Sequence, residues 1–400
     1  MRSLLSLSLA GILSPIKKIF ASPAIDARYI RQIVSDDDTT GRTIMWHSSG
    51  HSSALHLDWR EPDAKREHRV DATDDYFVDD GESVFIHSSY IKGLKPGHTY
   101  EYAISTEGGK SPWYTFRTDD GQSMKAIILS DSQCADDYAT WSRTVSDAVK
   151  YMPDADALMV LGDLVDNGED SYQWRRWFDM LTGIAERMTL VPVMGNHECY
   201  DIHWGNRIPA AYLNFFDVPG NGSTRFPRYY YSFDYGPIHF VVLNNCFEEL
   251  DALRGGLLAE EMEWLRADLD ETQQKWRVVL MHRDIIDYDA SPLKIESFAK
   301  KFAPIFEEGH VDIVIAAHIH SYRRRPRLKN FHRNKAGIIY INDGIAGDQH
   351  LVPPLFPWDE VTAPKPETTN YMTLEATMDA LHFQCVVPGK GVVDDFTVKK

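Results

Sequence analysis

The strongest constraint on the fold is a pattern that recurs seven times: a short apolar run that ends in Asp, Asn or His. The clearest run is Ala157–Leu161 (ALMVL), which is followed by Gly162, Asp163, Asp166 and Asn167. Five apolar residues bounded by turn residues are typical of a buried strand that enters a loop. Asp163 alone could equally cap the next helix. Repetition of the pattern favours a site instead, because ligands bind at the carboxyl ends of strands in open α/β sheets.

The other six runs also deliver polar side chains that can bind metals. Carboxylate, amide and imidazole groups suit divalent first-row metals, and the lack of thiolates at these strand ends argues against a structural zinc site. In chain order, the runs are Lys125–Ser130 before Asp131 and Gln133, Thr189–Met194 before Asn196 and His197, Ile238–Leu243 before Asn244, Val278–Met281 before His282, Val311–Ala317 before His318 and His320, and Gly337–Ile341 before Asn342 and Asp343.

Length and charge narrow the class of protein. A chain of 400 residues can form two domains with full cores. The formal net charge of −17 argues against a nucleic-acid backbone as the main partner, because basic surface supplies that affinity. The run Arg323-Arg324-Arg325 is a candidate for part of a locally positive pocket.

The N-terminus predicts export. One Arg precedes the apolar stretch Leu4–Leu13, and small residues follow at Ala21, Ser22 and Ala24, so we expect a signal peptide over residues 1–24 and a secreted or periplasmic protein. Lys17-Lys18 after the apolar stretch leaves an amphipathic cytosolic leader as the alternative. No later stretch is apolar over the ~18 residues that a transmembrane helix needs.

The rest of the chain consists of two segments with different patterns of apolar residues. Residues 25–119 contain short runs rich in Ile, Val, Thr and aromatic residues, which predict a small all-β sandwich similar to fibronectin type III domains. Tyr100 after a Pro-Gly turn is similar to the tyrosine corner of such domains. From residue 120 to 400, strand-like runs alternate with helical periods such as Trp174, Trp177 and Leu181, which predict sheet layers flanked by helices.

Three of the four cysteines, Cys134, Cys199 and Cys246, lie just past predicted strand ends. In an oxidising compartment Cys199 and Cys246 could pair and fix the loop after His197. The alternative, buried free thiols that pack as small hydrophobic side chains, stays open.

Two divalent ions about 3.5–4 Å apart can clamp the attacking and leaving oxygens of a displacement at phosphorus, which requires a bridging carboxylate and further donors around each ion. Asp163 is the natural bridge. The pairs Asp131/Gln133 and His318/His320 are each two residues apart, so both members of a pair can face one ion. Asn196 and His282 complete the second ion, and His197 lies beside them, free to exchange protons.

The ordered blocks D-S-Q, GDLVDNG, GNHE, MH and HIH resemble the calcineurin-like metallophosphoesterase superfamily. The flanking stretches AEEMEWLRADL and FEEGHVDIVIAAHIHSYRR look like its purple acid phosphatase branch, which carries a fibronectin-like domain in front. The resemblance implies an α/β (α+β) four-layer sandwich, with two mixed β-sheets flanked by helices. It also implies a phosphoesterase that acts on a small phosphorylated substrate with two divalent ions.

Departures from that branch concern the metals. Asp166 stands where the branch has a Tyr that binds ferric iron, so we expect Fe, Mn or Zn without a ferric tyrosinate. Gln133 stands where many relatives have His, and an amide oxygen is a harder, neutral donor. The His that often follows the MH block is absent.

The resemblance assigns Asp131, Gln133, Asp163 and His320 to the first ion, and Asp163, Asn196, His282 and His318 to the second. It gives His197 the role of general acid or charge stabiliser, and makes His203, Trp204, Tyr322 and Arg323 candidate substrate contacts. A phosphomonoesterase is the expected function. A phosphodiesterase, a nucleotidase or a non-catalytic binding protein is the alternative, and the oligomeric state is not determined.

Overall fold

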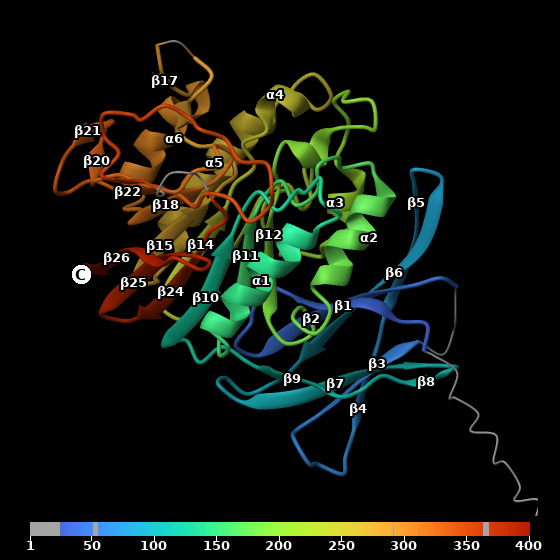
Figure 1. The fold of residues 1–400 in the computed structure, drawn as a ribbon. Coiled ribbons are helices and arrows are strands. Elements are labelled where there is room, and N and C mark those ends of the chain that lie inside the picture. Colours follow the sequence, from blue (N-terminus) through green and yellow to red (C-terminus); the bar gives the residue numbers. More distant parts are fainter. Residues whose placement is uncertain (1–24, 51–54, 291, 363–367) are drawn as a thin grey trace, which may run out of the picture.

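The computed structural model describes residues 25–50, 55–290, 292–362 and 368–400. The signal peptide predicted for residues 1–24 lies outside this part. Two large sheets dominate the fold (Figure 1). The first has ten strands in the order β26-β25-β24-β10-β11-β12-β1-β2-β6-β5, and the second has seven in the order β13-β14-β15-β18-β22-β19-β23.

The seven predicted strands form the centres of these sheets. They are β10 (Ser123–Leu129), β11 (Ala157–Leu161) and β12 (Thr189–Val193) in the first sheet, and β14 (Ile238–Val242), β15 (Trp276–Leu280), β18 (Ile313–Ala316) and β22 (Ile339–Asn342) in the second. Within each group, neighbouring strands pair in parallel. Parallel strands buried on both faces read as continuous apolar runs, which explains the pattern in the sequence.

Antiparallel strands extend both sheets at their edges. In the first sheet these are β2 (Gly41–Ser48), β5 (Thr73–Asp79), β6 (Glu82–Lys92), β24 (Tyr371–Thr377), β25 (Ala380–Val387) and β26 (Gly391–Lys399). β1 (Arg28–Ile33) lies between β12 and β2 and pairs in parallel with the first and antiparallel with the second. In the second they are β13 (Tyr231–Tyr235), β19 (Arg323–Arg324) and β23 (Val361–Thr362). Two separate two-stranded sheets consist of β16 (Ile286–Asp287) with β17 (Lys294–Ile295) and of β20 (Leu328–Lys329) with β21 (His332–Arg333).

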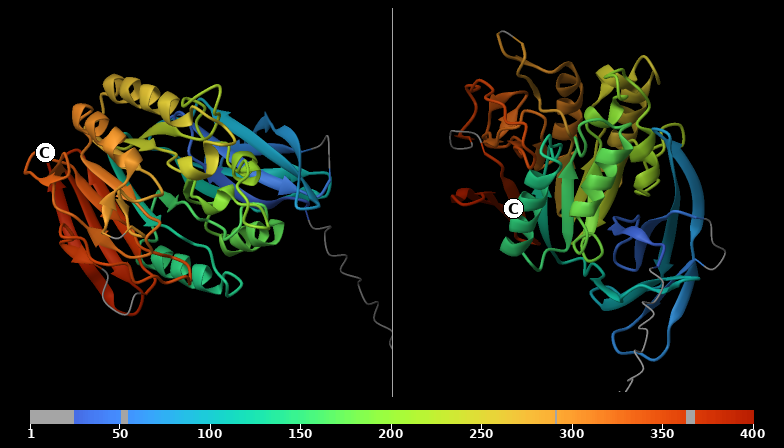
Figure 2. Two further views of the ribbon diagram at one scale, coloured as in Figure 1. Left: turned by 90° about the horizontal axis from the view of Figure 1, so that it is seen from above. Right: turned by 45° about the vertical axis from the view of Figure 1, so that its right-hand side comes forward.

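Helices cover the outer faces of the two sheets, so the central body has four layers, as expected. Seen from above, α5 and α6 lie on one side of the stacked sheets and α1 and α2 on the other (Figure 2). Buried apolar residues of α1, α2 and α6 belong to the same hydrophobic core as the central strands. The helices are α1 (Ala139–Tyr151), α2 (Ser171–Met180), α3 (Ala210–Phe215), α4 (Phe247–Leu250), α5 (Leu257–Glu271) and α6 (Ser297–Glu308), with a short 3₁₀ helix η1 at His197–Cys199.

The N-terminal strands form a second, smaller pair of layers. A five-stranded sheet of β3 (His56–Arg60), β4 (His68–Asp71), β7 (Thr99–Thr106), β8 (Gly109–Lys110) and β9 (Tyr114–Arg117) packs against β1, β2 and β6. Trp46, Leu57 and Tyr102 belong to the separate hydrophobic core between these layers. The layers are nevertheless joined to the central body, because β1 pairs in parallel with β12.

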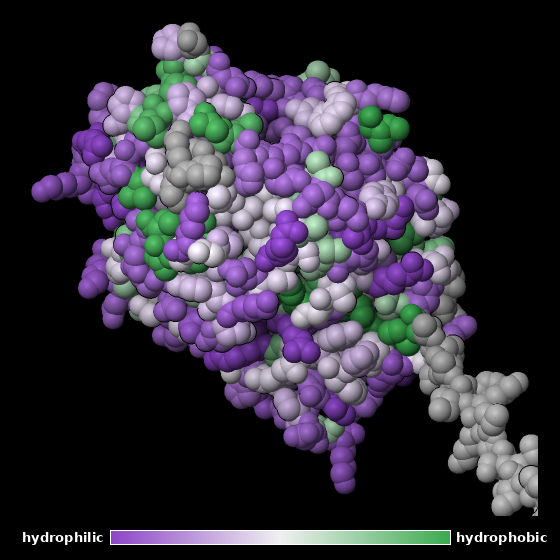
Figure 3. All heavy atoms as spheres, in the orientation of Figure 1, coloured by the Kyte–Doolittle hydropathy of each residue, from purple (hydrophilic) through white to green (hydrophobic). Residues whose placement is uncertain are grey.

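Hydrophilic residues dominate the face shown in Figure 3, and hydrophobic residues are scattered over it in small groups. Within the part of the chain that the structure describes, no helix is both long and apolar enough to cross a membrane.

Candidate metal centre

The predicted ligands meet where the two sheets present the carboxyl ends of their central strands. Each follows its strand by only a few residues, and the backbone turns sharply there. Asp131, Asp163, His318 and His320 have positive φ angles of 48°, 50°, 74° and 48°. Such angles are uncommon for residues other than glycine, and they cluster at functional sites because the surrounding structure must hold them.

Five of the predicted side chains form two groups that share one carboxylate. Asp131, Asp163 and His320 form the first group, and Asp163, His282 and His318 form the second. In each group the potential ligand atoms lie within 4.8 Å of one another. Asp163 therefore occupies the position that the sequence predicts for a bridge.

Backbone carbonyls orient the two histidines that face Asp163 and Asp131. The His282 Nδ1–H donates to the carbonyl of Leu161 at 2.8 Å, and its Nε2 lies 3.0 Å from Asp163 Oδ2. His320 donates from Nδ1 to the carbonyl of Gln349, and its Nε2 lies 3.3 Å from Asp131 Oδ1. Both rings thus keep Nε2 directed at the carboxylates, which is how protein histidines are held for metal binding.

The two amide side chains of the predicted set lie next to these histidines. Asn196 Oδ1 is 3.1 Å from His282 Nε2, and the Asn196 amide donates to the Tyr200 hydroxyl at 3.4 Å. Gln133 Nε2 is 3.4 Å from His320 Nε2. Among the described residues, the buried Gln133 Oε1 and Asp131 Oδ1 have no hydrogen-bond partner. Buried oxygens without donors fit a cation that binds between them.

The charges of the centre also fit a cation. Burial alone would raise the pKa of Asp163, but the charges of His282 and His197 outweigh it and hold this pKa far below its usual value. Burial lowers the pKa of His282, but Asp163 more than compensates and raises it to about 9. The Asp163 carboxylate thus keeps its negative charge and stabilises positive charge beside it. A bound metal ion can supply that positive charge in place of a proton on His282.

His197 borders the centre and is more accessible than the ligands. Its Nδ1–H donates to the carbonyl of Asp166 at 2.7 Å, and its Nε2 lies 3.8 Å from Asp163 Oδ2. The side chain is 18% exposed, whereas that of Asp163 is 1% exposed. His197 is therefore placed to contact a molecule that enters the centre from solvent.

Glu198 is an essential part of the arrangement that the sequence reasoning missed. Its buried carboxylate accepts hydrogen bonds from the backbone N–H groups of Gly195 (2.7 Å), Asp163 (3.0 Å) and Leu164 (2.8 Å). These contacts tie the loop after β12 to the loop after β11. The GNHE block contains this residue, so the signal was present, but its role depends on a partner 35 residues away.

Two of the predicted substrate contacts are wrong. Tyr322 is buried, and its hydroxyl donates to Asp394 at 2.7 Å. Arg323 is buried too, and it donates to Asp359 at 2.7 Å and to the carbonyl of Pro353. Both side chains are used inside the fold, since β19 runs away from the centre along β22.

The other two predicted contacts are exposed and lie near His197 in the chain. The Trp204 ring is 56% exposed, and its centroid lies 5.8 Å from that of the His197 ring. His203 is exposed, and its backbone N–H donates to Asp201. The structure also adds Tyr288, whose ring centroid is 5.7 Å from that of His318.

Arg324 and Arg325 of the predicted basic run line an open pocket together with Arg327, Arg333 and Lys335, whereas Arg323 does not line it. Arg324 forms an ion pair with Asp394. Arg325 forms a bidentate ion pair with Asp284, in which Nη1 and Nη2 donate to the two carboxylate oxygens at 2.7 and 2.8 Å. The alternative of buried free thiols holds for the cysteines, because all four are free and buried.

Comparison with known proteins agrees with this geometry. Residues 124–322 match the model of the family described as calcineurin-like phosphoesterase, and residues 28–118 match that of the purple acid phosphatase N-terminal domain. The chain belongs to the calcineurin-like phosphoesterases. This calcineurin-like phosphoesterase has purple acid phosphatases among its relatives.

The curated relatives are longer than the aligned region. Purple acid phosphatase 15 of Arabidopsis thaliana is 27% identical over 318 residues, which cover 72% of this chain and 58% of the relative. Probable inactive purple acid phosphatase 9 of the same plant is 24% identical, with coverage of 76% and 55%. An uncharacterized Mycobacterium tuberculosis protein is 31% identical over 170 residues, with coverage of 39% and 31%. The chain thus spans less than three fifths of the length of each of these relatives.

Solved structures share the fold of this phosphoesterase. Purple acid phosphatase PPD1 from yellow lupin has a TM-score of 0.79 at 19% identity, covering 93% of this chain and 74% of that one. A structure of PhoD has a TM-score of 0.63 at 13% identity, with coverage of 92% and 88%. These neighbours confirm the predicted four-layer architecture with an all-β N-terminal part.

Proposed function

We propose that this chain hydrolyses phosphate esters with two divalent metal ions, and most readily phosphomonoesters. The observation that carries the proposal is the shared carboxylate of Asp163, which belongs to both groups of potential ligands. A single-ion or purely structural site has no need for a carboxylate placed between two donor sets.

We assign the residues to the two ions as the sequence predicts. Asp131, Gln133, Asp163 and His320 would hold the first ion, and Asp163, Asn196, His282 and His318 the second. When bound, two such ions stabilise negative charge on the attacking and leaving oxygens at phosphorus. Carboxylate, amide and imidazole donors without thiolate favour Fe, Mn or Zn.

His197 would act on the leaving group. The Asp166 carbonyl fixes its Nδ1–H and leaves Nε2 directed toward Asp163. A proton held at Nε2 can pass to the leaving oxygen, which makes the alcohol a better leaving group. Trp204 remains a candidate substrate contact because it is exposed and its ring lies 5.8 Å from that of His197, and the neighbouring His203 remains one because it is exposed.

We also propose that the chain is exported and that it divides into two segments. Export rests on the apolar N-terminal stretch at residues 1–24. We divide the chain into a fibronectin type III-like segment at 25–119 and a catalytic segment at 120–400. This division rests on the change in the pattern of apolar residues near residue 120 and on the two family matches.

Replacing the shared carboxylate tests the metal assignment. Asp163→Asn removes the anionic ligand of both ions, so we expect loss of bound metal and of hydrolysis. Metal content by plasma mass spectrometry and turnover of phosphomonoester and diester panels are the measurements. Glu375→Gln, an exposed change on β24, is a matched carboxylate control. Full metal content and activity in Asp163→Asn would contradict the two-ion site, and an inactive but metal-loaded wild type would favour a non-catalytic binding protein.

Replacing the proposed acid tests its role. His197→Ala should keep both ions and lose ~10²–10⁴-fold in kcat on an alkyl phosphate, the usual contribution of general acid catalysis. The loss should be much smaller on a nitrophenyl ester, whose leaving group needs no proton. Equal losses on both substrates would mean that His197 stabilises charge instead, and loss of metal would mean that it supports the second site.

A further inference from the structure

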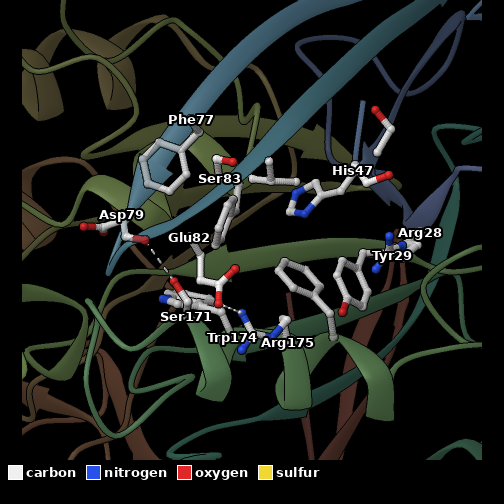
Figure 4. A pocket seen from close by; sticks show the side chains of 15 residues that line it. Arg28, Tyr29, His47, Phe77, Asp79, Glu82, Ser83, Ser171, Trp174 and Arg175 are labelled. Carbon is white, nitrogen blue, oxygen red and sulfur yellow. Dashed lines mark hydrogen bonds and ion pairs between the residues drawn. The ribbon is translucent and has the colours of Figure 1, made fainter. Parts of the chain in front are cut away.

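A cavity of about 280 Å³ lies between the N-terminal strands and helices α2 and α3 (Figure 4). None of the residues lining it is a candidate metal ligand. Ligand pockets typically occupy ~300–1,000 Å³, so the space suits a molecule of one or two rings. Its walls come from both the N-terminal and the central parts of the chain.

Aromatic rings form much of the wall. Tyr29 stacks on Phe178 with ring centroids 5.3 Å apart, and the Phe215 ring meets those of Phe77 and Trp174 edge-on, at 5.4 Å in both cases. Tyr29 reaches this position through a strained backbone with φ of 53°, next to an irregularity in the β1–β2 pairing. An irregularity in strand pairing can change the direction in which a side chain points. A strained backbone such as that of Tyr29 persists only where the surrounding structure holds it.

A buried hydrogen-bond donor faces the cavity from β2. His47 is only 4% exposed, and its ring projects toward the open space in Figure 4. Its Nε2 accepts from the guanidinium of Arg31 at 3.1 Å, because a guanidinium can only donate, so the ring proton sits on Nδ1. Burial and the charge of Arg31 hold the pKa of His47 well below its usual value. No described residue accepts from this Nδ1–H, so a ligand atom is its natural acceptor.

The remaining polar groups at the cavity are mostly donors as well. Arg28 and Arg175 are 59% and 42% exposed, and each lies 3.8 Å from its nearest carboxylate, a loose pair that leaves the guanidinium able to turn. Burial raises the pKa of the Tyr29 hydroxyl, which keeps its proton and has no hydrogen-bond partner among the described residues. Asp79 is already held by Arg207 at 2.9 Å. Two other carboxylates oppose an anion, Glu82 beside Arg175 and Asp26 beside Arg28.

We propose that this cavity binds an aromatic carboxylate of one or two rings. The ring packs among the aromatic walls, and the carboxylate accepts hydrogen bonds from the His47 Nδ1–H and a guanidinium. Aromatic packing alone would accept any apolar ring. The hydrogen-bond donors of His47, Arg28 and Arg175 favour a ring that carries an anionic acceptor. The site is separate from the metal centre and does not depend on the proposed hydrolysis.

Calorimetric titration of the full chain with naphthalene-2-carboxylate tests the proposal. We expect saturable binding, about tenfold or more weaker with the neutral naphthalene-2-carboxamide, because charge-assisted hydrogen bonds are lost. Arg175→Gln should weaken binding by a similar factor. Arg176→Gln is the matched control on the same helix, since Arg176 pairs with Asp137 and Asp179 and does not line the cavity. Glu82→Gln should tighten binding, because it removes the opposing charge and frees Arg175.

Two further variants distinguish this cavity from the metal centre. Ser83→Trp, a change at an exposed wall residue, should abolish binding by filling the cavity, and Asp163→Asn should leave binding unchanged. Loss of binding in Asp163→Asn would place the carboxylate at the metal centre and overturn the proposal. Absence of saturable binding, or equal affinity for carboxylate and carboxamide, would overturn it as well.

Discussion

His239 should make the stability of the fold depend on pH. It lies on β14, opposite Asp234 of β13, and its ring is almost fully buried. Its Nδ1 is 2.7 Å from Asp234 Oδ1 and its Nε2 is 2.9 Å from Asp268 Oδ2 on α5. Burial alone would lower the pKa of His239, but hydrogen bonds to the two carboxylates raise it from 6.5 to about 9. The charged ring therefore connects α5 to the edge of the second sheet.

A pKa of about 9 in the folded state, against 6.5 in the unfolded chain, corresponds to about 3 kcal/mol of folding free energy. Since the pKa is higher in the folded state, this stabilisation is fully present below pH 6.5 and is lost as pH rises through 9. The assay is urea unfolding of the wild type and of His239→Gln at about pH 6 and about pH 9.5, on either side of the shifted pKa, with the same metal present. The difference in unfolding free energy between the two proteins should shrink by about 3 kcal/mol, because other titrating groups cancel. If this difference in unfolding free energy is the same at both pH values, His239 is not held in its charged form by Asp234 and Asp268.

Three further changes test other contacts. Arg325→Met leaves Asp284 buried and unpaired, which should cost about 3–5 kcal/mol in urea unfolding, and adding Asp284→Leu should recover most of the loss; a neutral single change would count against the pair. Gln133→His should raise zinc or iron content at limiting metal, because imidazole suits these ions better, and unchanged metal content and preference would exclude Gln133 as a ligand. Gly162→Ala should lower stability and metal content together, because its Cβ would lie 2.6 Å from His282 Nδ1 at a φ of +87°; normal metal content would show that the loop adapts.

The sequence predicts the features that depend on local patterns. Apolar runs such as 157–161 predict parallel strands, because parallel strands are buried on both faces. The regular spacing of aromatic residues predicts helices such as α2. The candidate ligands can be predicted because each lies within a few residues of its strand. Such predictions require no knowledge of distant contacts.

The features that the sequence did not predict depend on partners far along the chain. Tyr322 and Arg323 follow the HIH block, but Asp394 and Asp359 decide where their side chains lie. The cavity at His47 combines residues from several separate strands and helices, none of which carries a recognisable motif. Burial and pairing at such positions are properties of the whole fold.

The parallel pairing of β1 with β12 has a consequence for how the chain can be divided. A deletion that removed residues 25–119 would leave β12, a strand rich in apolar residues, with one side unpaired. Exposed edges of this kind recruit strands from other molecules, so the shortened chain should associate into aggregates even with every candidate metal ligand present. The N-terminal strands thus act as a cover that keeps this edge of the first sheet from pairing with other molecules, and the two parts are expected to fold and unfold together.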